Sequence, residues 1–181
     1  MKYDKIITLK DGRQCCLRNG TESDGQAVFE NFNLTHEQTD YLLSYPDENS
    51  MDAEQEGQFL KERSESENEI QLIALVDGVV AGTAGIEAVG AKYKVKHRAE
   101  LGIGIDRRFW GLGIGRGLLD ACIECAKTAG YTQLELDVVA ENQRAVSMYE
   151  QAGFVEYGRN PRGFCSRSAG YQELIYMRLE L

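Results

Sequence analysis

The stretch Glu100-Leu-Gly-Ile-Gly-Ile-Asp-Arg-Arg-Phe-Trp-Gly-Leu-Gly-Ile-Gly-Arg-Gly-Leu-Leu119 decides the fold that the sequence predicts. In its first half, apolar residues alternate with glycine or acidic residues up to Asp106, which is the period of a β-strand. Glycines then recur at alternate positions from 111 to 117. A helix begins within this run, because apolar residues recur at helical spacing from Ile114 to Ala129. The stretch therefore predicts a strand, a glycine-rich turn and the start of a helix.

The glycine-rich turn has the features of a phosphate-binding site. Glycines let backbone N–H groups turn inward and come close to a ligand. At a helix N-terminus, unpaired N–H groups and the helix dipole both favour an anion. The dinucleotide pattern G-x-G-x-x-G fails, because Arg116 or Leu118 stands at its last position, and a Walker loop is excluded because no Gly-Lys-Ser/Thr exists. A glycine-rich turn that only redirects the chain is the alternative.

The turn resembles the loop of the GCN5-related N-acetyltransferases, whose pattern is Gln/Arg-x-x-Gly-x-Gly/Ala. The segment Trp110-Gly-Leu-Gly113-Ile-Gly115 matches it except at the first position, where Trp110 replaces Gln or Arg. Arg108 also fits the spacing, in a register that places the helix less well. In that family the loop amides bind the pyrophosphate of acetyl-coenzyme A (acetyl-CoA). The resemblance therefore implies acetyl-CoA as co-substrate. The implied coenzyme-binding residues here are Ile103, Ile105, Gly111, Gly113, Ile114, Gly115 and Arg116.

A second segment resembles another signature of the same family, Asn-x-x-Ala-x-x-x-Tyr-x-x-x-Gly-Phe. It matches at every named position, which are Asn142, Ala145, Tyr149, Gly153 and Phe154. The spacing puts Asn142, Ala145 and Tyr149 on one helix face. The resemblance implies that Asn142 contacts the coenzyme and that Tyr149 lies near its sulfur. The alternative is that Asn142 caps a helix and Tyr149 is a core residue bonded to a carbonyl.

The implied reaction is acyl transfer from a thioester to an amine, by direct attack in a ternary complex. A free alkylamine has a pKa of about 10, so the acceptor must lose a proton before it attacks. The leaving thiolate benefits from a general acid, and family resemblance assigns that role to Tyr149. A backbone N–H near Ile103 is the expected donor to the oxyanion.

Glu100 is the candidate general base. It lies on the predicted central strand, on the same face as Gly102 and Gly104, where the ligand is expected. Some members of the family carry a base glutamate at a comparable place. The alternative is that Glu100 forms an ion pair with Arg98 or a lysine. Glu87, at the end of the preceding strand, is a second candidate.

Composition restricts the class of protein. A chain of 181 residues suits one well-packed domain, so residues 1–181 are expected to form a single N-acetyltransferase domain. The net charge of −9 argues against a nucleic-acid partner and is compatible with an amine acceptor, either a small molecule or a protein N-terminus or lysine. No apolar run reaches membrane length, and we expect a cytoplasmic protein without a membrane partner. A homodimer is a family-level expectation.

The five cysteines are not expected to bind a metal. Cys122 and Cys125 lie on the apolar stripe of the predicted helix, which favours core packing over redox or zinc chemistry. Cys15 and Cys16 are adjacent in a predicted strand, so their side chains point to opposite faces. Acyl transfer through Cys165 is less favoured than direct attack, because no base is identifiable near it in the sequence.

The order of elements predicts an α+β fold, in which a mixed sheet is flanked by helices. The family resemblance adds a mostly antiparallel sheet that is splayed at the coenzyme site. Helices are expected around Ala27–Asn33, over Asp52–Glu65, from Ile114 and over Asn142–Ala152. Strands are expected at Ile6–Leu9, Gln14–Arg18, Ile70–Val76, Val79–Glu87, Ala99–Ile105, Leu134–Val138, Phe154–Tyr157 and Tyr171–Leu179. The segments Leu34–Ser50, Ala88–Lys96 and Gly158–Gly170 are expected to be irregular and to shape the acceptor pocket.

Two other classes of function compete with the enzyme. One is a non-catalytic sensor domain that binds acetyl-CoA or CoA, and the retained Tyr149 argues mildly against it. The other is an interaction domain whose glycine loop binds nothing.

Overall fold

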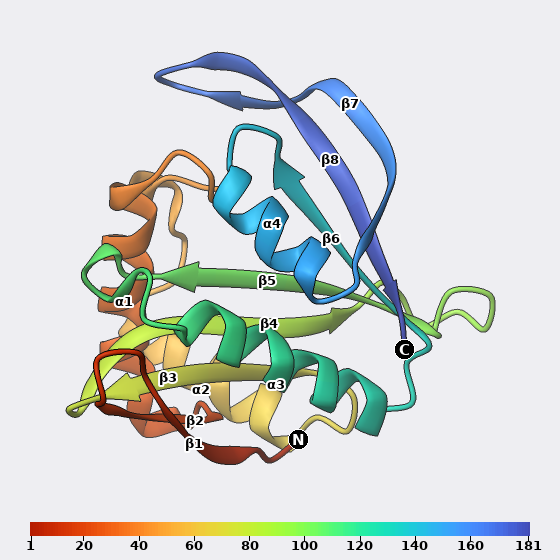
Figure 1. The fold of residues 1–181 in the computed structure, drawn as a ribbon. Helices are drawn as coiled ribbons and strands as arrows, with labels where there is room; N and C mark the ends of the chain where they lie inside the picture. Colours follow the sequence, from red (N-terminus) through yellow and green to blue (C-terminus); the bar gives the residue numbers. More distant parts are fainter.

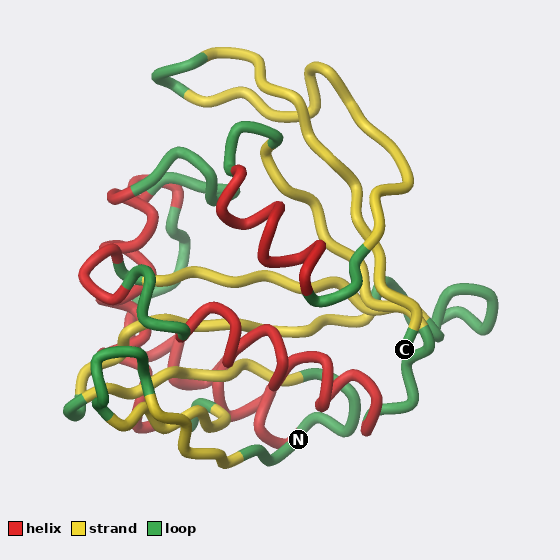
Figure 2. Tube along the Cα trace, in the orientation of Figure 1, coloured by secondary structure: helices red, strands yellow, loops and turns green.

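Eight strands form one mixed sheet, and four helices pack on it (Figures 1 and 2). The computed structural model describes all residues, 1–181. The order of strands across the sheet is β1-β2-β3-β4-β5-β6-β8-β7. The strands are β1 (Asp4–Thr8), β2 (Gln14–Asn19), β3 (Ile70–Val76), β4 (Val79–Ala88), β5 (Arg98–Ile105), β6 (Gln133–Val139), β7 (Val155–Ser166) and β8 (Gly170–Glu180). The helices are α1 (Gly25–Gln38), α2 (Ala53–Glu65), α3 (Ile114–Thr128) and α4 (Gln143–Gln151), with short 3₁₀ turns η1 (Glu22–Asp24), η2 (Pro46–Glu48) and η3 (Arg107–Phe109).

The sheet is splayed between β5 and β6. These strands form the one parallel pair, and they are paired only where Arg98–Glu100 meets Gln133–Glu135. Beyond Glu100, β5 stays paired with β4 as far as Ile105, whereas its other edge has no strand partner. Figure 1 shows β6 turning away from β5 over this stretch. The structure thus confirms the mixed sheet that the order of elements predicts and the splay that the family resemblance implies.

The helices cover both faces of the sheet. α3 packs on the face formed by residues such as Leu72 of β3 and Leu101 of β5, and its stripe from Ile114 to Cys125 is buried there. On the opposite face, Val28 of α1 and Leu60 of α2 pack on Ile73. Figure 1 shows α3 in front of the sheet, and α1 and α2 behind it. None of the helices combines the length and hydropathy that a membrane span needs.

Helix α1 is longer than the sequence predicts. It begins at Gly25 and continues to Gln38, five residues into the segment that was expected to be irregular. Tertiary contacts explain the extension, because Thr35 is buried and the side chain of Gln38 donates to Asp106 (3.1 Å) and accepts from the N–H of Arg107 (2.7 Å). Burial against the sheet overrides the weak helix propensity of these polar residues.

The predicted loop Gly158–Gly170 is wrong for most of its length, because β7 continues to Ser166. Figure 2 shows strand structure almost to the tip of the β7–β8 hairpin. The pairing with β8 shifts register between Glu156 and Gly158 and again between Asn160 and Phe164, and Pro161 lies within the second irregularity. β7 is an edge strand, where a proline costs no ladder hydrogen bond and bulges are tolerated.

The segment before α1 is stabilised by Asp24. Its carboxylate accepts hydrogen bonds from the Arg18 guanidinium (2.7 and 2.8 Å) and from the backbone N–H and hydroxyl of Thr21 (2.9 and 2.7 Å). The Arg18 contact is the main cause that lowers the pKa of Asp24 to about 2. A carboxylate with a lowered pKa stabilises the folded state above its unfolded pKa, and this contribution is lost as pH falls towards the folded pKa.

The variant Asp24→Asn is expected to lower the free energy of unfolding by about 2 kcal/mol at pH 7. The difference from the wild type should shrink as pH falls from 5 to 3, because Asp24 then becomes protonated in the unfolded state. Urea denaturation at several pH values measures both quantities. A difference that stays constant over this range would contradict the assignment.

Candidate active site

A cavity of about 1120 Å³ occupies the splayed region. Its wall includes residues of β5 and β6, the glycine loop and the first turns of α3 and α4. On the α1 side the wall includes Thr83 and Gly85 of β4, which pair with Gly104 and Gly102 of β5. A Cβ at Gly102 would meet no atom within 4 Å, so the sheet is open to a ligand there, whereas the Gln71 side chain covers Gly85.

The glycine loop presents unpaired amides to the cavity. Gly111 and Gly113 have φ of +82° and +103°, a conformation that L-residues rarely adopt. No backbone N–H from residue 111 to 116 donates a hydrogen bond within the protein. A Cβ at Gly113 would meet no atom within 4 Å, so the backbone there is open to a ligand. These amides, at the N-terminus of α3, fit the pyrophosphate of acetyl-CoA.

The unpaired edge of β5 offers further hydrogen-bond groups. The N–H of Asp106 donates to Ala81 of β4 (3.0 Å), so the alternate residues Ile105 and Ile103 direct their N–H groups away from β4. The carbonyl of Ile105 accepts from the indole of Trp110 (2.8 Å) on that side. The N–H of Ile103 therefore faces the gap between β5 and β6. There it can donate a hydrogen bond to the amide-bearing arm of a ligand or to an oxyanion.

Helix α4 places Asn142 and Tyr149 on the opposite wall of the cavity. Asn142 is the N-cap of α4, and its side-chain oxygen accepts from the N–H of Ala145 (3.3 Å). Asn142 therefore caps the helix, as the alternative expects. Its side-chain NH₂ makes no hydrogen bond in the protein.

Tyr149 is buried, with 7% of its surface exposed, and its ring packs on Phe154 with ring centroids 5.7 Å apart. Tyr149 belongs to the hydrophobic core, as the alternative expects, but its hydroxyl forms no hydrogen bond to a protein carbonyl. Burial raises the pKa of Tyr149 to about 12, so the phenol keeps its proton at neutral pH. An unpartnered O–H donor in the cavity wall suits a general acid.

Glu100 lies on the cavity wall without an ion pair, whereas its neighbours are paired. Arg98, the expected partner of Glu100, instead binds Glu135 through two hydrogen bonds, one of them 2.7 Å long. That contact lowers the pKa of Glu135. Glu87 stands opposite Glu100 in the β4–β5 pairing and lies 3.3 Å from the Arg63 guanidinium. Of the two candidate bases, only Glu100 is free to accept a proton without losing an ion pair.

The charges on the cavity wall are divided between two regions. Lys10, Arg116 and Arg144 are its basic residues, and Arg116 and Arg144 lie in the first turns of α3 and α4. The acidic residues belong to the sheet and to the turn after β6: Glu87, Glu100, Glu135, Asp137 and Glu141. Burial raises the pKa of Asp137. The cavity thus pairs basic groups near the glycine loop with carboxylates beside the sheet.

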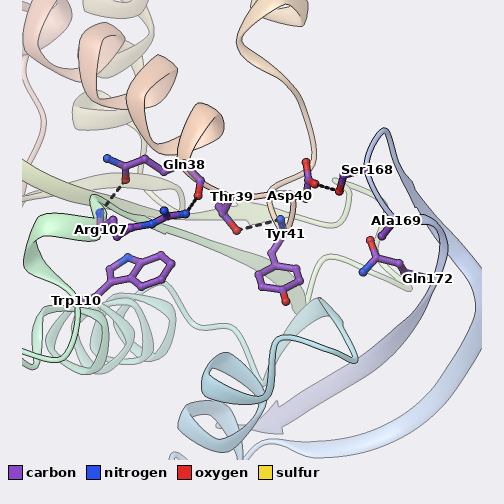
Figure 3. Close-up of a pocket in the computed structure, with 9 residues that line it drawn as sticks. All are labelled: Gln38, Thr39, Asp40, Tyr41, Arg107, Trp110, Ser168, Ala169 and Gln172. Carbon is purple, nitrogen blue, oxygen red and sulfur yellow. Dashed lines mark hydrogen bonds between the residues drawn. The ribbon is translucent and has the colours of Figure 1, made fainter.

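A second cavity of about 450 Å³ adjoins the first and shares Thr39, Tyr41 and Trp110 with it (Figure 3). The segment 39–49 and the tip of the β7–β8 hairpin meet above it. Ser168 donates to Asp40, and the N–H of Arg167 donates to the hydroxyl of Tyr45 (2.7 Å). Arg167 also lies 2.9 Å from Asp47. We call this set of contacts the clasp.

The three segments expected to shape the acceptor pocket have different outcomes. The first and third segments do contribute to the main cavity wall, through Thr35, His36, Thr39, Tyr41, Leu42, Leu43 and Phe164. Residues 88–96 contribute none, and Figure 1 shows this connection projecting from the other end of β4 and β5. The sequence reasoning also missed Arg144 and His36, which line the cavity. Arg144 occupies a variable position of the second motif, and His36 lies beyond the predicted end of α1.

The cysteines lie outside the cavity wall. Cys122 and Cys125 lie on the buried face of α3, and burial raises the pKa of both thiols. Cys15 is buried and its neighbour Cys16 is partly exposed, as opposite faces of a strand predict. Cys165 is exposed on β7.

Comparison of the sequence with models of known protein families identifies the family. The sequence model described as "Acetyltransferase (GNAT) family" matches residues 31–154. The chain belongs to the GNAT acetyltransferase family. Members of this family use acetyl-CoA as co-substrate, and the glycine loop described above fits its pyrophosphate.

Several proteins similar to this chain are named as acetyltransferases. A GNAT-family acetyltransferase from Streptococcus pneumoniae superposes with a TM-score of 0.88 and 29% identity, over 92% of this chain and 99% of that one. The fold is also that of yncA from Salmonella typhimurium, solved with its cofactor acetyl-CoA, with a TM-score of 0.81 and 19% identity over 92% and 94% of the two chains. A mycothiol acetyltransferase of Propionibacterium freudenreichii subsp. shermanii is 46% identical over 52 residues, which are 29% of this chain and 17% of that protein. The chain therefore spans less than a fifth of the length of that curated relative.

Proposed function

We propose that this GNAT acetyltransferase moves the acetyl group of acetyl-CoA to an amine by direct attack in a ternary complex. The observation that carries the proposal is the row of unpaired amides in the glycine loop, at the end of a gap that Tyr149 and Glu100 line from opposite sides. Residues 1–181 act in this proposal as one catalytic domain, since all strands belong to one sheet.

The coenzyme is bound along the gap between β5 and β6. The amides of Gly113, Ile114, Gly115 and Arg116 bind its pyrophosphate, assisted by the dipole of α3 and by the open backbone at Gly113. Ile103 and Ile105 bind its amide-bearing arm through their outward backbone groups. The side-chain NH₂ of Asn142, which is free of protein partners, donates to the same arm.

Acetyl-CoA supplies the activated acetyl group, and the protein's residues move the protons. Glu100 accepts a proton from the bound ammonium, which leaves the neutral amine that attacks. The N–H of Ile103 stabilises the negative charge that develops on the acetyl oxygen. Tyr149 donates its phenolic hydrogen to the departing sulfur, and the resulting phenolate takes the second proton from the nitrogen of the new amide.

The acceptor is a cationic amine in this proposal. Five carboxylates of the cavity wall lie beside the sheet or just after β6, which attracts a positive charge to that region. The five cysteines are free thiols, which agrees with a reducing compartment such as the cytoplasm.

Calorimetric titration with acetyl-CoA is the first test, because it requires no knowledge of the acceptor. Saturable binding at one site is expected. A panel of amines, assayed for release of the CoA thiol, then separates an enzyme from a sensor domain. Binding without turnover of any amine would favour the sensor, and a folded protein that binds no acetyl-CoA would overturn the proposal.

Glu100→Gln tests the base. We expect kcat/KM for the amine to fall about 100-fold at pH 7, which is the usual contribution of a general base. The deficit should shrink as pH rises towards 10, because more of the amine is then already neutral in solution. Steady-state kinetics from pH 6.5 to 9.5 measure both effects.

Glu87→Gln is the matched control, since Glu87 stands opposite Glu100 but is paired with Arg63. It is expected to change kcat/KM less than threefold. The reverse pattern, a large loss in Glu87→Gln and a small one in Glu100→Gln, would move the base to Glu87.

A further inference from the structure

Trp110 is the residue at which the glycine loop departs from the family pattern, and the structure gives the indole a fixed position. Its ring N–H donates to the carbonyl of Ile105 (2.8 Å), which ties the indole to the end of β5. Trp110 is 38% exposed, and it borders both cavities. Figure 3 shows it at the edge of the smaller cavity, beneath Arg107.

The guanidinium of Arg144 lies against this indole. Its central carbon is 5.2 Å from the centroid of the Trp110 ring, within the range of a cation–π contact. Arg144 belongs to the first turn of α4, on the wall of the cavity that faces the loop. A Cβ built on Gly111 would lie 3.6 Å from one terminal nitrogen of Arg144, so the guanidinium lies next to the loop backbone.

Arg144 has no acidic partner and donates no hydrogen bond in the protein. The other arginines in or next to the loop are engaged, and among them Arg108 binds Asp106 (2.7 Å). Arg116 is paired with Asp120 (2.8 Å), and Arg107 donates to the carbonyl of Gln38 at the end of α1. Arg144 is therefore a fixed guanidinium with unused donors beside a row of unpaired amides. A guanidinium in this state suits a phosphate group, which it can bind through two parallel hydrogen bonds.

We propose that Trp110 positions Arg144 over the glycine loop, where the guanidinium binds the phosphates of acetyl-CoA. The family pattern places a Gln or Arg side chain at position 110, and here a neighbouring element supplies the guanidinium while the indole holds it. The inference rests on the proposed function, because it assumes that the loop binds acetyl-CoA. Trp110 acts as a positioning residue, and Arg144 as the residue that contacts the coenzyme.

The test measures acetyl-CoA affinity by calorimetry in Arg144→Gln, Trp110→Leu and the double variant. Each single variant is expected to weaken binding 10- to 30-fold. The double variant should be no weaker than Arg144→Gln, because the indole has nothing to position once the guanidinium is gone. Trp110 is the only tryptophan in the chain, so its fluorescence should change on titration of the wild type and much less in Arg144→Gln.

Two further variants sharpen the test. Trp110→Arg, made in the Arg144→Gln background, returns a guanidinium to the family position and is expected to recover most of the lost affinity. Arg107→Gln is the matched control, since Arg107 also packs on the ring, at 5.4 Å, but is tethered to α1. It is expected to change the affinity less than threefold.

The outcomes separate this inference from the proposed function. A wild type that binds no acetyl-CoA would remove the proposed function and the inference with it. Normal affinity in Arg144→Gln, with a wild type that binds, would overturn only the inference. Losses that multiply in the double variant would show that the two residues act independently, and would remove the positioning role of Trp110.

Discussion

Replacement of Gly113 by leucine is expected to weaken acetyl-CoA binding by at least 100-fold. The added side chain would project from a residue with φ of +103° into space that no protein atom occupies, where the phosphates are proposed to lie. A hydrogen bond to a charged group contributes about 1.5–3 kcal/mol, so loss of two loop amides costs about 3–6 kcal/mol, or 100-fold or more. Calorimetry measures the change in affinity.

A matched control exists at the other end of the same helix. Gly130 follows α3, has φ of +82°, and offers equally open space for a Cβ. Gly130→Leu therefore introduces similar backbone strain, about 1–2 kcal/mol, away from the cavity. It should lower thermal stability about as much as Gly113→Leu and leave acetyl-CoA affinity unchanged. Equal affinities in the two variants would exclude the loop as the phosphate site.

Removal of the Tyr149 hydroxyl should produce the second large effect, on turnover and not on binding. We expect Tyr149→Phe to lower kcat about 100-fold, the scale of a lost general acid, with a change of less than threefold in acetyl-CoA affinity. Stability should change little, because the hydroxyl has no hydrogen-bond partner in the protein. Since burial raises the pKa of Tyr149 to about 12, kcat should show no loss from its ionisation below pH 10.

Tyr131→Phe provides the comparison. Tyr131 is also buried, but its hydroxyl accepts a hydrogen bond from Asn68 (2.8 Å) outside the cavity. This variant should lose about 1 kcal/mol of stability and keep its kcat, the opposite of Tyr149→Phe. Unchanged turnover in Tyr149→Phe at saturating substrates would remove Tyr149 from the mechanism.

The glycine loop and the second motif were predictable from sequence because their chemistry is local. Positive φ and a free helix N-terminus demand glycine at fixed spacing, and the α4 face that carries Asn142 and Tyr149 follows from helical periodicity. Glu100 also lies on the cavity wall, and its role as the base stays a prediction.

Other features depend on contacts between distant segments, which a single sequence does not display. The pairing of Arg98 with Glu135 joins residues 37 positions apart, and it decides that Glu100 stays unpaired. Arg144 occupies a variable position of its motif, and its position beside the loop appears only when α4 packs opposite it. The extra length of β7 was missed because Pro161 and the nearby glycines are typical of loops, whereas an edge strand accommodates them.

The clasp gives the two halves of the splayed sheet a second connection. The two halves of the sheet are joined near one end of the gap by three paired residues of β5 and β6, and near the other end by the side chains of the clasp. The two sides of the gap are thus connected at two places, and the two connections differ in strength. Exposed ion pairs such as that of Arg167 contribute little to stability and are screened by salt. The clasp is therefore expected to break before the strand pairing does. Higher ionic strength is therefore expected to release the β7–β8 hairpin from the segment 39–49 before it affects the pairing of β5 with β6.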